Sequence, residues 1–436
     1  MIQVNSLLVT FLAVFLLRSG TQVFLDRLNI SRLRQQGKMV PEAFRDVVDR
    51  EKLGRICDYT RDSARFGMVG TLTNQLLSLV ILLSGLLPWI VQVIDSWGFG
   101  PIIDGLVFFA LFSMASGLLH IPFSLYHAFV IEGRYGFNVM TLKIWMIDLL
   151  KGTAVSAILG GLLLWLLLAI VIHGGTAWWF WAWMLTGGFE LLVLWLFPAV
   201  IAPLFNKFEP IEDKDLEERI RKLMKEAGLK VQGVFQMDAS KRSRHTNAYF
   251  TGISTSKRIV LFDTLLASHT HEEILAVLAH ETGHWKRRHV LKQVMLAEVL
   301  CFAGFYWVAR CLGWPLLYRT FGFTESIPYV GLFLVGALAS PFTYFAQPLV
   351  SAISRMFERE ADDFALELMK TPQPMAGALK RLAADNLANL TPHPLYAWFY
   401  YSHPSLVERI ERLKREKGGW EGFQNPFSKQ RRINGS

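Results

Sequence analysis

The sequence predicts a mainly α-helical, polytopic membrane protein with seven transmembrane helices and a polar insert that contains a small β-sheet. Of its 436 residues, 52% are hydrophobic and 19% are charged, whereas soluble domains carry about one quarter charged residues. Seven apolar stretches recur, most of them near or above the roughly 20 residues that a helix needs to cross a bilayer. They cover residues 4–17, 68–94, 102–131, 153–172, 177–205, 290–312 and 327–353.

The first apolar stretch differs from a secretory signal peptide. No basic residue precedes it, and Arg18 follows it, whereas a signal peptide carries its positive charge before the apolar run. We therefore expect residues 4–17 to form a retained membrane anchor.

Basic residues alternate between the loops, and this asymmetry predicts the orientation. The loop at residues 18–65 is rich in arginine, whereas residues 96–101 and 174–176 contain no basic residue. Loops rich in Lys and Arg face the cytoplasm, which places the N-terminus outside and residues 206–289 and the C-terminal region in the cytoplasm. The net charge of +9 then reflects loops that face anionic lipid and requires no nucleic-acid partner. A bacterial inner membrane and the endoplasmic reticulum both fit.

The polar insert at residues 206–289 has the pattern of a small α/β unit. Leu216, Ile220 and Leu223 have helical spacing within residues 215–227, and residues 231–237, 248–253 and 258–262 read as short strands. Thr270 and Glu273 have the spacing of a capping box at the start of a further helix. After the seventh span, helices are expected at residues 356–369, 375–388 and 405–417. The three cysteines are too few for a disulfide framework or a thiolate metal cage.

The chain is thus expected to have four parts. Residues 1–205 hold transmembrane helices 1–5 and their loops, residues 206–289 the insert, residues 290–353 helices 6 and 7, and residues 354–436 a C-terminal helical region.

The helix that starts after Thr270 carries a metal-binding motif. His280 and His284 lie four residues apart on one helical face, with Glu281 beside them, as in metalloproteases in which the Glu is the catalytic base. A catalytic zinc site needs a third protein ligand and an open position for water. His289 is one residue out of register for a third histidine. The residues leave three options open: Glu358 as the ligand, Glu360 as the ligand, or an ordinary solvated helix face at that segment. Asp362, one turn beyond Glu358, could accept a hydrogen bond from a ligand imidazole.

Four motifs together resemble the type I CAAX prenyl proteases, which are membrane-embedded gluzincin zinc enzymes. Residues 132–138 and 203–208 are also similar to loops of that family, so the resemblance spans nearly the whole chain. The four motifs are Asn247-Ala248-Tyr249, His280-Glu281-x-x-His284-Trp285, Glu358-x-x-Ala361-Asp362 and Ser402-His403-Pro404.

The resemblance implies a seven-helix barrel around a large water-filled chamber, closed on the cytoplasmic side by the metalloprotease insert. It implies that Glu358 is the third ligand of one Zn²⁺ ion, that His403 stabilises the tetrahedral intermediate and that Arg409 lies beside it. It further implies that the strand at Asn247, Ala248, Tyr249 and Phe250 pairs with an extended peptide substrate. Without the resemblance, His403 is a turn residue before Pro404 and the strand is merely structural.

The expected function is hydrolysis of peptide bonds in a peptide or protein substrate, with or without a C-terminal prenyl group, by a monomer in the bilayer. One alternative is a quality-control metalloprotease that degrades misfolded membrane proteins. Another is a seven-helix transporter or receptor with a structural zinc site. Glu190 lies within an apolar stretch, and an intramembrane acid is costly unless it is functional or paired. It is expected to face the chamber or to pack against a polar neighbour.

Overall fold

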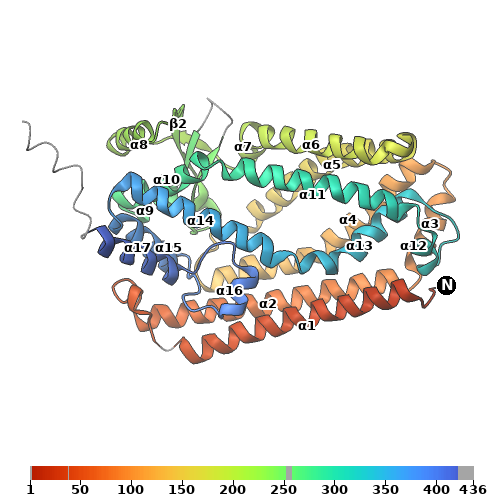
Figure 1. Ribbon diagram of the computed structural model, residues 1–436, viewed down its shortest axis with the longest axis horizontal. Coiled ribbons are helices and arrows are strands. Elements are labelled where there is room, and N and C mark those ends of the chain that lie inside the picture. The colour runs from red at the N-terminus through yellow and green to blue at the C-terminus, as the bar shows by residue number, and fades with distance from the viewer. Residues whose placement is uncertain (1, 38, 252–257, 421–436) are drawn as a thin grey trace, which may run out of the picture.

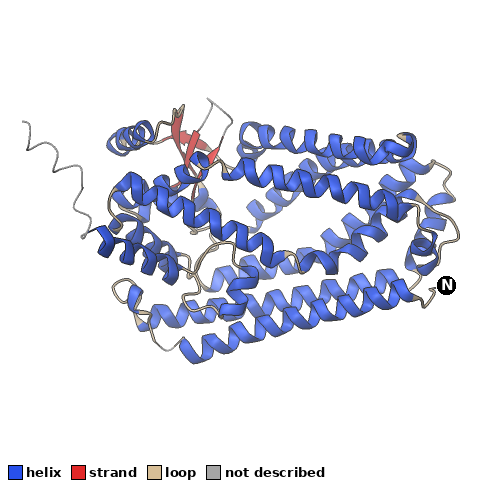
Figure 2. Ribbon diagram, viewed as in Figure 1, coloured by secondary structure: helices blue, strands red, loops and turns tan. Residues whose placement is uncertain are grey.

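The computed structural model describes residues 2–37, 39–251 and 258–420. The last two residues of the strand expected at 248–253 and the chain after residue 420 lie outside the described residues. The chain is mainly helical, with one small sheet (Figure 2).

Six helical segments in the described ranges are long and apolar enough to cross a membrane, and a bent pair of helices makes a seventh crossing. The predicted seven spans are therefore confirmed. Most of the long helices run roughly along the long axis of the molecule (Figure 1). The crossings are α1 (Ser6–Gln36), α2 (Arg50–Leu83), α4 (Pro101–Leu125), α5 (Leu142–His173), α6 (Trp178–Leu196), α11 (His289–Leu312) and the pair α13 (Pro328–Tyr344) and α14 (Gln347–Met369).

Short elements connect or extend these helices. The α4 and α6 helices each continue into a π-helical segment, η2 and η4, and a proline at or near each of these transitions disturbs the regular hydrogen-bond ladder. The short elements of the membrane region are η1 (Glu42–Phe44), α3 (Leu86–Asp95), η2 (Tyr126–Glu132), η3 (Gly175–Ala177), η4 (Phe197–Ile201), α7 (Ala202–Phe205) and α12 (Pro315–Thr320).

The seventh crossing differs from the expectation in one respect. The helix expected at residues 356–369 begins earlier, at Gln347, and α14 therefore holds both the end of the apolar stretch and the acidic motif. The break lies at residues 345–346, where the two helices meet at 60°. Pro348 explains its position, because proline has no N–H with which to continue the hydrogen-bond ladder of α13. The same rigid helix thus connects the membrane to Glu358.

The insert forms a four-stranded mixed sheet with the order β1-β2-β4-β3. The β2 and β4 strands are parallel, and the other two pairs are antiparallel. The sequence did not predict β1, which has only three residues. The β3 strand lies at the edge of the sheet. The elements of the insert are β1 (Phe208–Pro210), α8 (Lys214–Glu226), β2 (Gly233–Met237), η5 (Ala239–Lys241), β3 (Ala248–Thr251), β4 (Arg258–Phe262) and α9 (Asp263–Ser268).

A buried core joins the insert to the C-terminal helices. The α8 helix, the inner face of the sheet and α10 (His271–Lys286) contribute Ile220, Ile259 and Leu278, which are each fully buried, and α14 adds Ala365. This core fixes α10 between the sheet and α14 (Figure 1). The remaining helices are α10 (His271–Lys286), α15 (Gln373–Asp385), α16 (Pro394–Tyr400) and α17 (Leu406–Trp420).

Candidate metal centre

The predicted capping box defines the start of α10, the helix that carries both candidate histidine ligands. The Glu273 backbone N–H donates to the Thr270 hydroxyl over 3.3 Å, and the Thr270 N–H donates to the Glu273 carboxylate over 2.8 Å. Arg381 of α15 also donates to this carboxylate. These bonds fix where the helix starts, and the 3.6-residue period then places His280 and His284 on the face toward α14.

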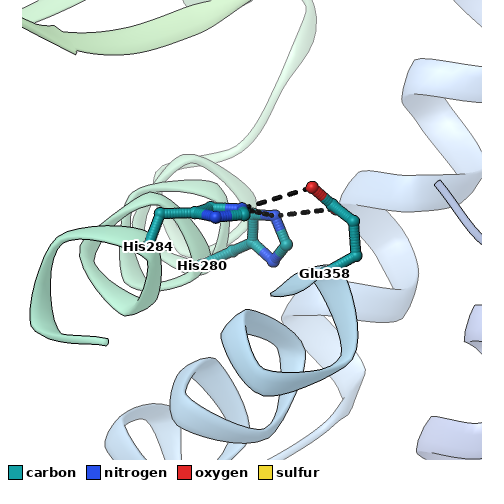
Figure 3. Close-up of side chains that lie close together, drawn as sticks. All are labelled: His280, His284 and Glu358. Carbon is teal, nitrogen blue, oxygen red and sulfur yellow. Dashed lines mark hydrogen bonds and ion pairs between the residues drawn. The ribbon is translucent and has the colours of Figure 1, made fainter. Parts of the chain in front are cut away.

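Close packing of α10 against α14 brings the third candidate ligand within reach. A Cβ atom added at Gly283 would lie 2.9 Å from the Ala361 Cα atom and 3.0 Å from the Ala361 carbonyl oxygen. The two helices can therefore approach this closely only because residue 283 has no side chain. Figure 3 shows the result, in which Glu358 extends from α14 toward both imidazole rings.

Gly283→Ala is expected to lower the free energy of unfolding by about 1–3 kcal/mol, the usual effect of overpacking a core, and to weaken metal binding. The added methyl group meets backbone, which cannot rotate away, so α14 must move. Thermal denaturation and metal titration measure the two effects. Gly304→Ala is the matched control, because a Cβ atom there meets nothing within 4 Å. Equal melting temperatures for the two variants would contradict the packing argument.

The three side chains have the spacing of a tetrahedral metal site. The His280 and His284 Nε2 atoms are 3.2 Å apart, and they lie 3.4 and 3.3 Å from the two Glu358 carboxylate oxygens. Tetrahedral zinc with bonds of about 2.0–2.1 Å holds its ligand atoms about 3.3 Å apart. Among the described residues, this is the only group of three His, Cys, Asp or Glu side chains whose ligand atoms converge in this way.

Hydrogen bonds behind the rings fix which ring nitrogen is free to bind a metal. The His280 Nδ1 atom lies 2.8 Å from the Asp362 carboxylate and donates to it, so the His280 Nε2 atom is the one that can give up its proton to bind a metal. The His289 Nε2 atom lies 3.0 Å from Glu360 and donates to it, so the His289 Nδ1 atom accepts from His284 Nδ1 over 3.0 Å. Both Nε2 atoms therefore face Glu358 and are the ring nitrogens available to a metal, as ligation requires.

His289 was not predicted to have a part in the site. Arg288 has a left-handed backbone, with a φ of 54°, and it turns the chain sharply between α10 and α11. His289 thereby packs back against His284 and stacks on Phe357. The available sequence signal was a third histidine just after the motif, together with Glu360, which the sequence analysis considered only as a metal ligand.

The buried charges of the site shift one another's pKa values. Burial lowers the pKa of His280, but its hydrogen bonds to Asp362 and Glu358 outweigh burial and raise this pKa to about 9. Burial likewise raises the pKa of Glu358, but the hydrogen bonds from His280 and His284 hold it well below its usual range. A metal ion would therefore displace a proton from His280. The buried Glu358 Oε2 atom accepts no well-aligned hydrogen bond, and its nearest polar contact is the His280 Nε2 atom at 3.4 Å, which fits a carboxylate that binds a cation.

Glu281 also lies on α10, and its carboxyl group interacts electrostatically with His280, His284 and Glu358. Burial raises its pKa above the ordinary value. A carboxylate with a raised pKa beside a metal site is a stronger proton acceptor than an exposed one.

The structure also places both C-terminal candidates at the site. The exposed His403 has its Nε2 atom 3.2 Å from a Glu358 oxygen, at the open side of the cluster. Arg409 is buried, and it donates two hydrogen bonds to Asp362, over 2.9 and 2.6 Å. It therefore lies behind His280, and its nearest distance to Glu358 is 3.9 Å.

The strand expected to bind substrate is the edge strand β3. The Phe262 N–H donates to the Asn247 carbonyl over 3.1 Å. Because donors and acceptors alternate along an antiparallel strand, Ala248 and Phe250 direct their backbone groups away from β4. The Asn247 side chain accepts from the Ala248 N–H over 2.8 Å. Tyr249 faces the opposite side of the sheet from Ala248 and Phe250, which pack toward the core that contains α10.

Glu190 lies between α6 and α11, where its carboxyl group forms a hydrogen bond with Glu298 of the neighbouring helix. This is the polar partner that the sequence analysis considered as one of two options for an acid inside an apolar stretch.

Comparison with known proteins shows similarity to membrane-bound metallopeptidases. The family described as CAAX prenyl protease N-terminal, five membrane helices, matches residues 29–207, and peptidase family M48 matches residues 210–417. The Arabidopsis thaliana protein CAAX prenyl protease 1 homolog is 35% identical, over 91% of this chain and 94% of the relative. The Saccharomyces cerevisiae CAAX prenyl protease 1 is 34% identical, over 86% of this chain and 88% of the relative.

A solved structure extends the likeness to the fold. The crystal structure of S. mikatae Ste24p matches with a TM-score of 0.89 at 32% identity, and the match covers 94% of this chain and 100% of that chain. The expected resemblance is thereby confirmed. With its metal-binding cluster of two histidines and a glutamate at the end of a helical membrane region, the chain belongs to peptidase family M48, as a membrane metallopeptidase of the CAAX prenyl protease 1 type.

Proposed function

We propose that this chain is a zinc endopeptidase that cleaves near the C-terminus of CAAX-type substrates. The observation that carries the proposal is the convergence of His280, His284 and Glu358 at 3.2–3.4 Å, with Glu281 beside them. Two imidazole nitrogens and one carboxylate are the ligand set of a catalytic zinc site with one position left open. The peptidase family leaves no support for a transporter or receptor with structural zinc.

Zinc bound here would activate a water molecule and polarise the scissile carbonyl group. Glu281 accepts the proton of the attacking water and passes it to the leaving amine, which requires a carboxylate held close to the ligands. His403 stands at the open side of the cluster and donates to the carbonyl oxygen as negative charge develops on it. Asp362 holds His280 in the required tautomer, and Arg409 positions Asp362.

The substrate binds as an added strand along β3. In the described residues, no strand pairs with the outer edge of β3, and Ala248 and Phe250 offer N–H and carbonyl groups there. Such pairing recognises an extended backbone more than a particular sequence. The Asn247 side chain, which satisfies the Ala248 N–H in this structure, would give way to a substrate carbonyl.

The low burial of the membrane helices fits the expected chamber inside the membrane region. None of the residues in the most apolar part of α11 is buried, and few are in α5 and α6. Helices of a compact bundle bury one face, and a chamber inside the ring of helices would account for the low burial of these three. A cavity of about 650 Å³ lies between α2, α4 and α5, and its lining combines apolar side chains with polar ones that include Asn74, His120 and His127.

The proposed enzyme has one catalytic chain, a defined membrane and a defined side for its metal site. The protein acts as a monomer in a bacterial inner membrane or the endoplasmic reticulum, with the metal site on the cytoplasmic side. The division at residues 205, 289 and 353 separates the membrane helices from the parts that build the site.

A farnesylated CAAX peptide is expected to be cleaved about tenfold or more faster than the same peptide without the prenyl group, since the buried isoprenoid adds apolar contact. Cleavage of both peptides by the purified protein in detergent, followed by mass spectrometry, measures the ratio. Equal rates would favour the alternative of a general membrane peptidase. No cleavage of either peptide by protein that contains zinc would contradict the proposed function.

A further inference from the structure

A cluster of polar side chains joins the membrane region to the segment that precedes the edge strand β3. The ring of His245 lies at its centre. The His245 Nε2 atom is 3.0 Å from a Glu132 carboxylate oxygen, and the Nδ1 atom is 2.9 Å from the Asn386 side-chain oxygen. Glu132 ends η2, and Asn386 follows the last residue of α15. One imidazole therefore links the membrane region, the insert and the C-terminal helices.

The hydrogen-bond partners of this ring favour its positively charged form. The Thr246 backbone N–H donates to the Asn386 side-chain atom that faces His245. That atom must therefore be the amide oxygen, an acceptor, so His245 Nδ1 must donate to it. The other ring nitrogen faces a carboxylate and donates as well, so both nitrogens are protonated. The ring also stacks on Phe137, with the centroids 4.0 Å apart, which favours a cation.

The surroundings of Glu132 support this charge state. The Tyr59 hydroxyl of α2 donates to the other carboxylate oxygen over 2.7 Å, and the His127 Nε2 atom lies 3.9 Å from it. The titratable groups that these contacts place around His245 are thus Glu132 and His127 from η2 and Tyr59 from α2. The Asn386 contact from α15 is neutral.

The same segment is attached to the membrane region at several further points. The Arg244 N–H donates to the Phe137 carbonyl over 3.0 Å, and the Val139 N–H donates to the Arg242 carbonyl over 3.2 Å. The Arg242 guanidinium binds both carboxylate oxygens of Asp148 in α5, at 2.7 and 2.9 Å. Residues 242–246 are therefore fixed on the membrane side, and β3 begins only three residues after His245.

We propose that His245 is a positioning residue, whose protonated ring, held between Glu132 and Asn386, sets the place of β3 for pairing with an extended peptide. This inference rests on the proposed substrate strand. It gives a function to residues 132–138, which neither the metal cluster nor the proton transfer explains. Glu132 and Asn386 act through His245, and none of the three touches the metal ligands.

The charge on the ring makes the position of β3 depend on pH. The hydrogen bond to Glu132 raises the pKa of His245 above its ordinary value of 6.5, although burial opposes this. A raised pKa means that the bond stabilises the folded arrangement fully below pH 6.5 and that this stabilisation is lost as the pH rises through the raised pKa. Substrate binding is thus expected to weaken on the alkaline side.

The test measures KM and kcat for a farnesylated CAAX peptide between pH 6 and pH 9, on the full-length protein in detergent. For His245→Gln we expect a KM about tenfold higher at pH 6, the loss of one hydrogen bond between charged groups. We also expect little change in kcat or zinc content. The part of the alkaline rise of KM that comes from His245 should be absent, so that only the part caused by titration at the metal site remains. For Glu132→Gln, the alkaline rise should move to lower pH.

Asp148→Asn is the matched control. It breaks the Arg242 contact to the same segment but leaves the titrating ring, so KM should rise while its pH dependence stays that of the wild type. A wild-type pH profile of KM in His245→Gln would overturn the proposal, as would a parallel loss of kcat and zinc in that variant, which indicates a merely structural role.

Hydrogen exchange separates this proposal from the proposed function. Amides of residues 248–251 should exchange faster in His245→Gln than in the wild type at pH 6, and the difference should shrink at high pH, after correction for intrinsic exchange. This result does not require hydrolysis. If the wild type cleaves no peptide but the two proteins differ in exchange in this way, the proposed function is wrong and the role of the network of Glu132, His245 and Asn386 is supported. Equal exchange at both pH values refutes the network.

Discussion

Glu281→Gln protein is expected to bind zinc as the wild type does and to lose peptidase activity by about 10²–10⁴-fold, the range of general acid–base catalysis. Glutamine keeps the shape of the side chain but cannot accept the proton of the attacking water. The three ligand atoms belong to other residues, so the metal stays. Zinc analysis and peptide cleavage on the same preparation measure both quantities.

Glu272→Gln is the control for this variant, because Glu272 is an exposed acid at the other end of α10 that pairs with Arg219. It should keep full activity. If Glu281→Gln retained wild-type activity, the proton acceptor would have to be another group.

Glu358→Ala is expected to lose zinc and activity together. The substitution removes one of three protein ligands and leaves the His280 and His284 Nε2 atoms, 3.2 Å apart, without the carboxylate that completes the site. It also removes the buried charge that lies beside both rings. Zinc content after dialysis, together with a titration against a chelator of known affinity, measures the loss.

Glu360→Ala distinguishes the two acids that the sequence left open. Glu360 binds His289, which supports His284 from behind, so its loss should weaken zinc binding only about 10–100-fold. If zinc were lost from Glu360→Ala and kept by Glu358→Ala, the metal ligand would be Glu360 and the assignment to Glu358 would be wrong.

The amino-acid pattern alone could not decide whether Glu358 or Glu360 is the metal ligand. Positions 358 and 360 point to nearly opposite sides of a helix, so one can be a ligand only if its face packs on α10. That face is set by the contact between Gly283 and Ala361, which involves two helices far apart in the chain. The resemblance favoured Glu358, and the geometry of the cluster agrees with it. Local elements could be predicted more fully, because their signals lie close together in the chain. The capping box of Thr270 and Glu273 predicted the start of α10 correctly.

Two features escaped prediction because tertiary contacts decide them. The three-residue strand β1 has too few residues for a periodic pattern, and it exists because β2 offers it a partner. His289 looked out of register on a regular helix, and the left-handed turn at Arg288 brings it back to His284. The network around His245 is a third case, since its parts lie in segments more than 100 residues apart.

The central claim is that His280, His284 and Glu358 bind one zinc ion. A crystal of the wild-type protein, measured on both sides of the zinc absorption edge, tests it most directly. The claim predicts a single strong anomalous peak within about 2.0–2.2 Å of the two Nε2 atoms and a Glu358 oxygen. A peak at other side chains, or the same peak in crystals of Glu358→Ala, would contradict it.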